Sequence, residues 1–226
     1  MSKTRSLTLI ALMMISSLAQ GSVVLGGTRV IYDAGKKESN ISVKNPTKNP
    51  FLVQSWVQNS DNADAKAPFI VTPPLFRLDG KKENVLRIIN TGGQLPQDRE
   101  SLFWLNVKAI PKSADTDVNT LQIAVNTQIK LLYRPQDLPS SPDEAAKTLD
   151  WRLESGQLKV ANNSPYYINF HSVKINGQDI DSATMVPPKS TSAFKLNKTI
   201  KTGGEISWKI INDYGGSSAL MQKKLN

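Results

Sequence analysis

The chain of 226 residues contains no cysteine and a single histidine. Without cysteine there is no disulfide framework, no Cys-ligated zinc or iron–sulfur site and no cysteine nucleophile. One histidine, His171, excludes metal motifs that need two imidazoles and leaves little for acid–base chemistry. The G-x-S-x-G motif that positions a nucleophilic serine is also missing. We therefore expect no catalytic residues, no metal and no cofactor, which disfavours a secreted hydrolase, and we expect His171 to be a solvated residue on a strand.

The chain also lacks the pattern of a nucleic-acid-binding protein, although it is basic. It has 28 Lys and Arg residues against 19 Asp and Glu residues. Nucleic-acid binders usually concentrate their basic residues on one face and interleave aromatic residues for stacking. Here the basic residues are scattered in short groups such as Lys36–Lys37, Lys81–Lys82 and Lys223–Lys224. We expect solvated surface charge that steers an acidic partner, and no nucleic-acid partner.

No apolar run in the chain is long enough for a transmembrane helix. The run Leu7–Ile15 is far shorter than the roughly 20 residues that span a bilayer. It follows a basic start and precedes Ala19 and Gly21, small residues at positions −3 and −1 of a cut before Ser22. Residues 1–21 are therefore expected to be a secretory signal, although a cut after Ala19 is also allowed. The exported chain then keeps 26 basic and 19 acidic residues.

Alternating apolar and polar residues dominate the rest of the first half, with turn residues such as Asp79-Gly80 between the segments. The expected strands are Val23–Asp33, Ser39–Asn45, Phe51–Gln58, Phe69–Leu78, Asn84–Asn90, Leu102–Ile110 and Thr120–Tyr133. Short strands at this spacing are typical of an antiparallel immunoglobulin-like sandwich.

Three prolines between Arg134 and Pro142 interrupt this pattern, because proline donates no backbone hydrogen bond and fixes φ. We expect a domain boundary here, between residues 22–138 and 139–226. A helical turn over Asp143–Leu149 is expected to be too short to matter. The second strand series is Trp151–Glu154, Gln157–Asn162, Tyr166–Ile175, Thr184–Val186, Ser192–Leu196, Glu205–Asn212 and Ala219–Leu225. The sequence thus predicts an all-β protein with two immunoglobulin-like sandwiches in tandem.

The segment Thr120–Tyr133 is longer than the usual strand of roughly 5–6 residues. Its odd-numbered positions are mostly apolar, from Leu121, Ile123 and Val125 to Ile129. One interpretation is a long strand that faces its own core throughout, and alternation alone favours it. The other is that the first half overhangs and offers Leu121, Ile123 and Val125 to another protein by strand addition. Periodicity does not separate the two.

Several blocks of sequence together form a specific pattern. They read T-R-V-I-Y from Thr28, T-P-P-L-F-R-L from Thr72, L-P-Q-D-R-E-S-L-F-W from Leu95, L-Q-I-A from Leu121, I-K-L-L-Y-R-P from Ile129, N-S-P-Y-Y from Asn163 and I-N-D-Y-G-G from Ile211. Over nearly all of its exported length, the chain resembles the periplasmic pilus-assembly chaperones of the chaperone–usher pathway, the PapD-like family.

This resemblance implies two domains set at an angle with a cleft between them, and a chaperone of the periplasm. Such a chaperone inserts an edge strand into the incomplete fold of a pilus subunit, caps it and delivers it to an outer-membrane usher, without using nucleotide. Leu121, Ile123 and Val125 match the donor residues of that strand. Pilus subunits, an adhesin and the usher are then the partners, and the resemblance also allows a self-capped homodimer of the free protein.

Two further residue sets follow from the resemblance. Arg29 and Lys130 match the cleft residues that hold the subunit's C-terminal carboxylate, and a bidentate Arg beside a compact Lys charge suits that task. Glu100, Arg134 and Asp213 match an ion network between the domains. The alternative for both sets is solvated surface charge, where each pair contributes roughly 0–1 kcal/mol.

The connection Pro111–Asn119 is short and carries no cysteine pair, which looks like the short-loop branch of the family. The alternative function is a structural pilus subunit or surface adhesin built from similar sandwiches. Such a subunit would normally be a single incomplete domain, often with a cysteine pair, whereas this chain has two strand series and no cysteine.

Overall fold

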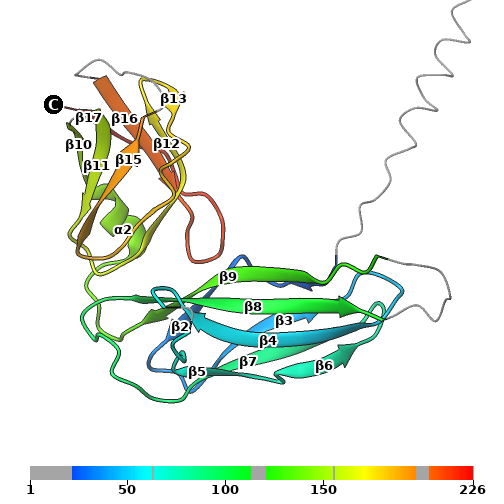
Figure 1. Ribbon diagram of the computed structural model, residues 1–226. Coiled ribbons are helices and arrows are strands. Elements are labelled where there is room, and N and C mark those ends of the chain that lie inside the picture. The colour runs from blue at the N-terminus through cyan, green and yellow to red at the C-terminus, as the bar shows by residue number, and fades with distance from the viewer. Residues whose placement is uncertain (1–21, 63, 113–120, 155, 197–203, 226) are drawn as a thin grey trace, which may run out of the picture.

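The computed structural model describes residues 22–62, 64–112, 121–154, 156–196 and 204–225, which form two β-sandwiches joined end to end (Figure 1). Each sandwich encloses its own core of buried apolar side chains. The second sandwich stands on one end of the first, so that the two meet at an angle (Figure 1). The predicted all-β architecture with two immunoglobulin-like domains in tandem is confirmed. The expected signal, residues 1–21, lies outside the described residues.

The first domain consists of two packed sheets. Its strands are β1 (Val24–Leu25), β2 (Arg29–Asp33), β3 (Ser39–Lys44), β4 (Phe51–Asn59), β5 (Phe69–Thr72), β6 (Leu75–Leu78), β7 (Glu83–Asn90), β8 (Ser101–Pro111) and β9 (Val125–Arg134). The sheet with strand order β2-β9-β8-β4-β6 is called the cleft sheet below, and the sheet with order β1-β3-β7-β5 the back sheet. Within the cleft sheet β2 runs parallel to β9, whereas β8 runs antiparallel to it.

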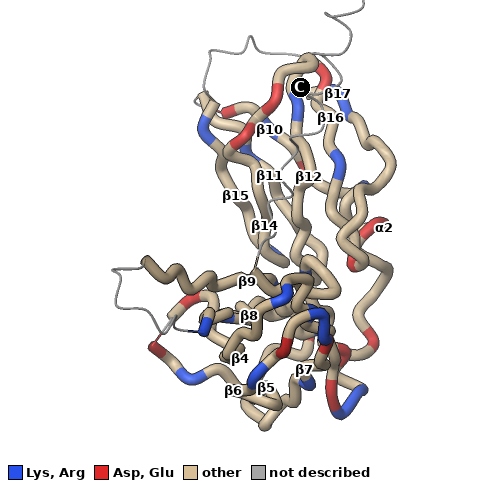
Figure 2. Tube along the Cα trace, turned by 90° about the vertical axis from the view of Figure 1, so that its right-hand side faces the viewer, with Lys and Arg blue, Asp and Glu red and all other residues tan. Residues whose placement is uncertain are grey.

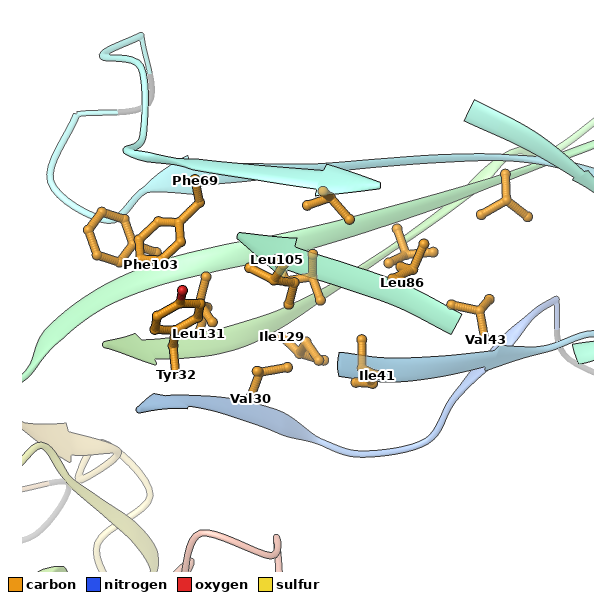
Figure 3. Close-up of a cluster of buried hydrophobic side chains, with 14 of the residues drawn as sticks. Val30, Tyr32, Ile41, Val43, Phe69, Leu86, Phe103, Leu105, Ile129 and Leu131 are labelled. Carbon is orange, nitrogen blue, oxygen red and sulfur yellow. The ribbon is translucent and has the colours of Figure 1, made fainter. Parts of the chain in front are cut away.

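The core of the first domain fixes the orientation of β9. Ile129 and Leu131 point inward among apolar side chains of both sheets (Figure 3). Aromatic rings close one end of this core, where Phe69 lies 5.3 Å from Tyr32 and 4.9 Å from Phe103, measured between ring centroids. Both contacts are edge-to-face, the geometry that the ring quadrupoles favour. Because side chains alternate along a strand, the residues between the inward-facing ones are directed to the outer face of the cleft sheet.

Two segments expected as single strands are each divided between the two sheets. Val23–Asp33 forms β1 in the back sheet and β2 in the cleft sheet. The change occurs after Gly26, where an added Cβ would lie 2.5 Å from Ser42 Oγ, so only glycine fits without displacement. Phe69–Leu78 likewise forms β5 and β6, because the two prolines after Thr72 cannot donate hydrogen bonds to a ladder. The buried positions change from odd-numbered to even-numbered across both breaks, a shift that the sequence interpretation did not take into account.

The second domain follows the predicted strand series closely. Its strands are β10 (Asp150–Glu154), β11 (Gln157–Asn162), β12 (Ile168–Ile175), β13 (Gln178–Asp179), β14 (Met185–Val186), β15 (Ser190–Lys195), β16 (Gly204–Ile210) and β17 (Met221–Leu225). One sheet has the order β10-β11-β15 and the other β13-β12-β16-β17, with β14 paired to β12. The two-residue strand β13 was not predicted, since it is too short to show alternation.

The prediction that the helical turn after the boundary is too short to matter is wrong. Helix α2 (Pro142–Lys147) begins at Ser141, whose Oγ accepts a hydrogen bond from Glu144 N at 3.3 Å. Its Ala145 and Ala146 are buried in the second core. The indole of Trp208 donates to Ala146 O at 3.1 Å, which gives a buried polar group a partner. This single turn therefore closes one end of the second core.

Candidate functional site

Arg29 and Lys130 lie side by side although about a hundred residues separate them in sequence. The parallel pairing of β2 with β9 makes them direct partners in the ladder. Both reach the second domain: Arg29 Nη1 donates to Ile211 O at 3.2 Å, and Lys130 Nζ donates to Asn169 Oδ1. The structure thus places the two cations of the predicted carboxylate site together at the junction of the domains.

The surroundings of this pair favour an anion. Burial lowers the pKa of Arg29, while Asp213 and Glu100 act in the opposite direction. Burial also lowers the pKa of Lys130, and the adjacent Arg29 charge lowers it further. Among the described residues Arg29 Nε has no hydrogen-bond partner, although it is buried. A buried donor without a partner costs about 1–3 kcal/mol, and an incoming carboxylate oxygen would remove that cost.

A cavity of about 410 Å³ opens beside Lys130. Lys130 forms part of its wall on the side of the first domain, and Asn169–Val173 of β12 and the loop around Asp181 form the wall on the second. His171 lines the cavity and is exposed, at the point where the pairing of β12 with β16 shifts its register. The expectation of a solvated strand histidine is confirmed. The cleft between the domains is therefore open to solvent next to the cation pair.

Glu100, Arg134 and Asp213 form one hydrogen-bonded ion network across the junction, where basic and acidic residues lie close together (Figure 2). Arg134 Nε donates to Glu100 Oε1 at 2.7 Å. Its two terminal nitrogens donate to the two Asp213 oxygens at 2.7 and 2.8 Å. The guanidinium also lies over the ring of Tyr166, 5.3 Å from its centroid. Since Glu100 and Arg134 belong to the first domain and Asp213 to the second, the network joins the two.

Glu100 has a second connection to the other domain. Its Oε2 accepts a hydrogen bond from Tyr167 N at 2.7 Å, and its own N–H donates to Pro165 O at 2.9 Å. The carboxylate is almost completely buried, with 1% of the side chain exposed. Burial raises the pKa of Glu100, whereas Arg134 and the Tyr167 N–H oppose that shift. For Arg134 burial lowers the pKa, but its bonds to Asp213 and Glu100 outweigh burial and raise it. The network therefore stabilises the charged form of Arg134, whereas burial makes the charged form of Glu100 less favourable than in water.

Sequence reasoning missed two residues of the junction. Asn169 of β12 holds Lys130, and Lys189 forms an exposed ion pair with Asp98 of the first domain. Hydrogen bonds from Arg99 and Lys189 hold the pKa of Asp98 well below its usual range. Neither residue carries a signal in the sequence, because an asparagine on a strand and a lysine in a loop are ordinary. Only the docking of the two domains brings them into contact with Lys130 and Asp98.

The predicted donor residues lie at the free end of the β9 segment. Leu121, Ile123 and Val125 are 89%, 68% and 42% exposed, which is unusual for large apolar side chains at regular spacing. They continue the alternation of Ile129 and Leu131, which are buried. The alternating apolar side chains are therefore buried at the Leu131 end of this segment and exposed to solvent at the Leu121 end.

The expected strand Thr120–Tyr133 is shorter in the structure, where β9 begins at Val125. Residues 121–124 belong to no strand, because the pairing of β8 with β9 ends at Ala109 opposite Val125. On the other side of β9, the pairing with β2 starts only at Lys130. The edge of β9 before Lys130 has no partner strand among the described residues, so this part of the strand is open to addition of another chain.

Comparison with known proteins identifies the family. Residues 22–139 match the family model for pili and flagellar-assembly chaperones, PapD N-terminal domain, and residues 144–222 match the pili assembly chaperone PapD, C-terminal domain. The two matches cover most of the chain. The protein therefore belongs to the PapD family of pilus-assembly chaperones, and the family predicted from the sequence is confirmed.

Similar proteins agree with this assignment. The chaperone protein FimC of Escherichia coli K12 is 46% identical over 214 residues, covering 92% of this chain and 87% of its own. The SafB chaperone of Salmonella enterica, in a solved structure with the SafA pilin, is 39% identical with a TM-score of 0.83, and the match covers 89% of this chain and 95% of the other. SfaE, described as a periplasmic chaperone, is 41% identical with a TM-score of 0.75, and the match covers 90% of this chain and 100% of SfaE.

The short-loop branch stays a prediction, since residues 113–120 of the connection lie outside the described residues. Over the part of the chain that the structure describes, no helix has the length and apolar character needed to cross a membrane.

Proposed function

We propose that this chaperone binds and caps pilus subunits in the periplasm by donor-strand complementation, with Leu121, Ile123 and Val125 as donor residues. One observation carries the proposal: an exposed apolar row leads into β9, and the unpaired edge of β9 ends at the cation pair Arg29 and Lys130. The related SafB chaperone has been solved in complex with the SafA pilin. Family membership supports an adhesin and the outer-membrane usher as further partners and a self-capped homodimer of the free protein.

Strand addition supplies affinity without demanding a particular partner sequence. The open edge of β9 presents backbone N–H and C=O groups, which a strand of the partner would pair. The alternate side chains enter apolar pockets of that partner and set the register. Fully burying one such side chain contributes about 1.5–3 kcal/mol, so three of them are enough to drive capture. Binding of this kind needs no nucleotide and no catalytic group.

The carboxylate site fixes the direction of the added strand. If the partner's C-terminus lies at Lys130 and its chain runs along the edge toward Leu121, that strand is parallel to β9. The added partner strand ends where β2 begins, because Arg29 of β2 is the ladder partner of Lys130. From Leu121 to Lys130 the span is about 30 Å at 3.3 Å per residue, so we expect a partner strand of about nine residues.

The ion network of Glu100, Arg134 and Asp213 sets the angle between the domains in this proposal. It holds the loop that carries Ile211 and Asp213 against the end of the cleft sheet. A fixed angle keeps the second domain beside the open edge of β9, where the captured subunit would contact both domains. The network is thus proposed to position the cleft, not to bind the partner.

The experiment compares Arg29→Ala and Lys130→Ala with the parent protein, using a cognate subunit identified by co-purification from the periplasm. Truncating one member of a buried charged contact costs about 2–5 kcal/mol, so stable complexes should be lost while circular dichroism is unchanged. Lys44→Ala, on an exposed position of the back sheet, is the matched control. Amidating the C-terminus of a subunit peptide should weaken binding to the parent and scarcely affect the two cleft variants. If amidation weakens peptide binding equally in the parent and both cleft variants, or weakens it in none of them, the carboxylate site is contradicted.

A further inference from the structure

Asn169 is a buried polar residue in the wall of the cleft, with 2% of its surface exposed. Its backbone is held from two sides: its carbonyl accepts from Ile211 N at 2.8 Å, and it pairs with Met185 of β14. The position of its side chain therefore follows from the fold of the second domain. That side chain crosses the junction and meets Lys130 of the first domain.

The chemistry of the contact defines which atom faces Lys130. A lysine ammonium has three donors and no acceptor, so its partner must be the amide oxygen Oδ1. The amide nitrogen of Asn169 is then directed at Tyr167 O, 3.5 Å away. Arg29 has a similar arrangement, since its Nη1 donates to Ile211 O. Each cation of the cleft thus meets a neutral oxygen of the second domain.

We propose that Asn169 is a positioning residue of the carboxylate site, whose neutral Oδ1 directs Lys130 into the cleft without cancelling its charge. The inference rests on the function proposed above. It adds a residue from the second domain to the cation pair, and it explains why a neutral acceptor occupies this place.

The acidic groups around Arg29 and Lys130 show why it matters that the Asn169 side chain is neutral. Glu100 and Asp213 are the carboxylates that act electrostatically on Arg29, and both accept hydrogen bonds from Arg134. Lys130 has no carboxylate within ion-pair distance among the described residues. The attraction of two adjacent cations for an anion therefore stays available to a ligand. An aspartate at position 169 has the same shape as asparagine but would supply that anion internally.

The test uses Asn169→Asp and Asn169→Leu, with Asn163→Asp as the matched control. Asn163 is exposed in the same domain, so it tests the added charge without the contact. The probe is the synthetic C-terminal peptide of the co-purified subunit, as free acid and as amide. Asn169→Asp should weaken binding of the free-acid peptide by roughly tenfold or more, which corresponds to about 1.4 kcal/mol or more. Binding of the amidated peptide should stay unchanged. The parent and Asn163→Asp should keep their preference for the free acid.

A second measurement needs no partner and would not respond to a merely structural role. Nuclear magnetic resonance of the Lys130 Cε reports the pKa of this ammonium in the free protein. Asn169→Asp should raise that pKa and Asn169→Leu should lower it, whereas Asn163→Asp should leave it unchanged. An unchanged pKa in both Asn169 variants, or undiminished preference of Asn169→Asp for the free acid, overturns the role of Asn169. If instead the parent binds neither peptide, the carboxylate site itself is overturned, and this inference with it.

Discussion

The two ends of the β9 segment carry the same alternation of apolar residues but lie in opposite environments. At one end Ile129 and Leu131 are buried between the cleft sheet and the back sheet, where β2 and β8 flank the strand. At the other end Leu121 and Ile123 are exposed, beyond the last pair that β8 offers. The difference shows that alternation decides which face a side chain takes, whereas neighbouring strands decide whether that face is covered. The apolar row thus continues beyond the paired part of its sheet and is exposed there, which supports its proposed role in binding.

The buried end is also the end that is tied to the second domain. Lys130 and Arg134 alternate with the core residues of the same strand and carry the contacts to Asn169 and Asp213. One strand thus holds the core on one face and the domain junction on the other, and its free end is available to a partner. Anchoring the strand at one end keeps the other in a defined position, which lowers the entropy lost when a partner binds.

The largest difference between the two ends should appear in stability. Leu131→Ala removes a completely buried side chain and leaves a cavity, so the free energy of unfolding should fall by about 2–5 kcal/mol. Ile123→Ala removes an exposed side chain of the same volume class and should change stability by no more than about 0.5 kcal/mol. Urea denaturation of both variants measures this. Equal destabilisation would mean that Ile123 packs in the protein's own core.

A smaller and more selective effect is expected from a charge at the free end. Ile123→Asp should impair capture of the subunit in periplasmic co-expression, because an unpaired carboxylate would enter an apolar pocket of the partner. The free variant should keep the parent's unfolding transition. Gln122→Glu places the charge on the adjacent residue and should retain capture. Undiminished capture by Ile123→Asp would show that this residue is not a donor residue.

The alternation of the β9 segment allowed its donor residues to be proposed from the sequence, but not the point where the strand ends. That point depends on where β8 stops, which a single strand does not encode. Most strand positions followed from period-two patterns, because each domain buries one face of each sheet. The breaks at Gly26 and after Thr72 were not predicted, although the buried positions change from odd-numbered to even-numbered there. Family resemblance, not periodicity, linked Arg29 with Lys130.

Contacts of the junction were the least predictable part of the site. Asn169 and Lys189 meet their partners in the first domain only when the domains dock, and nothing in their local sequence marks them. The single turn of α2 was underestimated for a similar reason. Its value lies in two buried alanines and in the hydrogen bond to Trp208, which are tertiary contacts.

Arg134→Ala should change the relation of the two domains more than the stability of either. The variant removes three hydrogen bonds of the junction and leaves Glu100 buried with only the Tyr167 N–H as its side-chain partner. The second domain then loses its fixed angle, while both cores keep their packing. Small-angle X-ray scattering of the free protein should show a broader distance distribution than that of the parent. An unchanged distribution with both domains melting earlier would assign Arg134 an intradomain role.

Lys189→Ala is the control on the same junction, and its effect should be the smallest. Lys189 and Asp98 also join the domains, but 39% and 51% of their side chains are exposed, against 20% for Arg134. Solvent and salt screen an exposed pair, and ordering two flexible side chains offsets most of what remains. Asp98 also keeps Arg99 as a partner when Lys189 is truncated. At physiological salt we expect scattering and melting curves that match the parent. If Lys189→Ala broadens the distance distribution as much as Arg134→Ala does, the domain angle depends on the rim of the junction and not on its buried network.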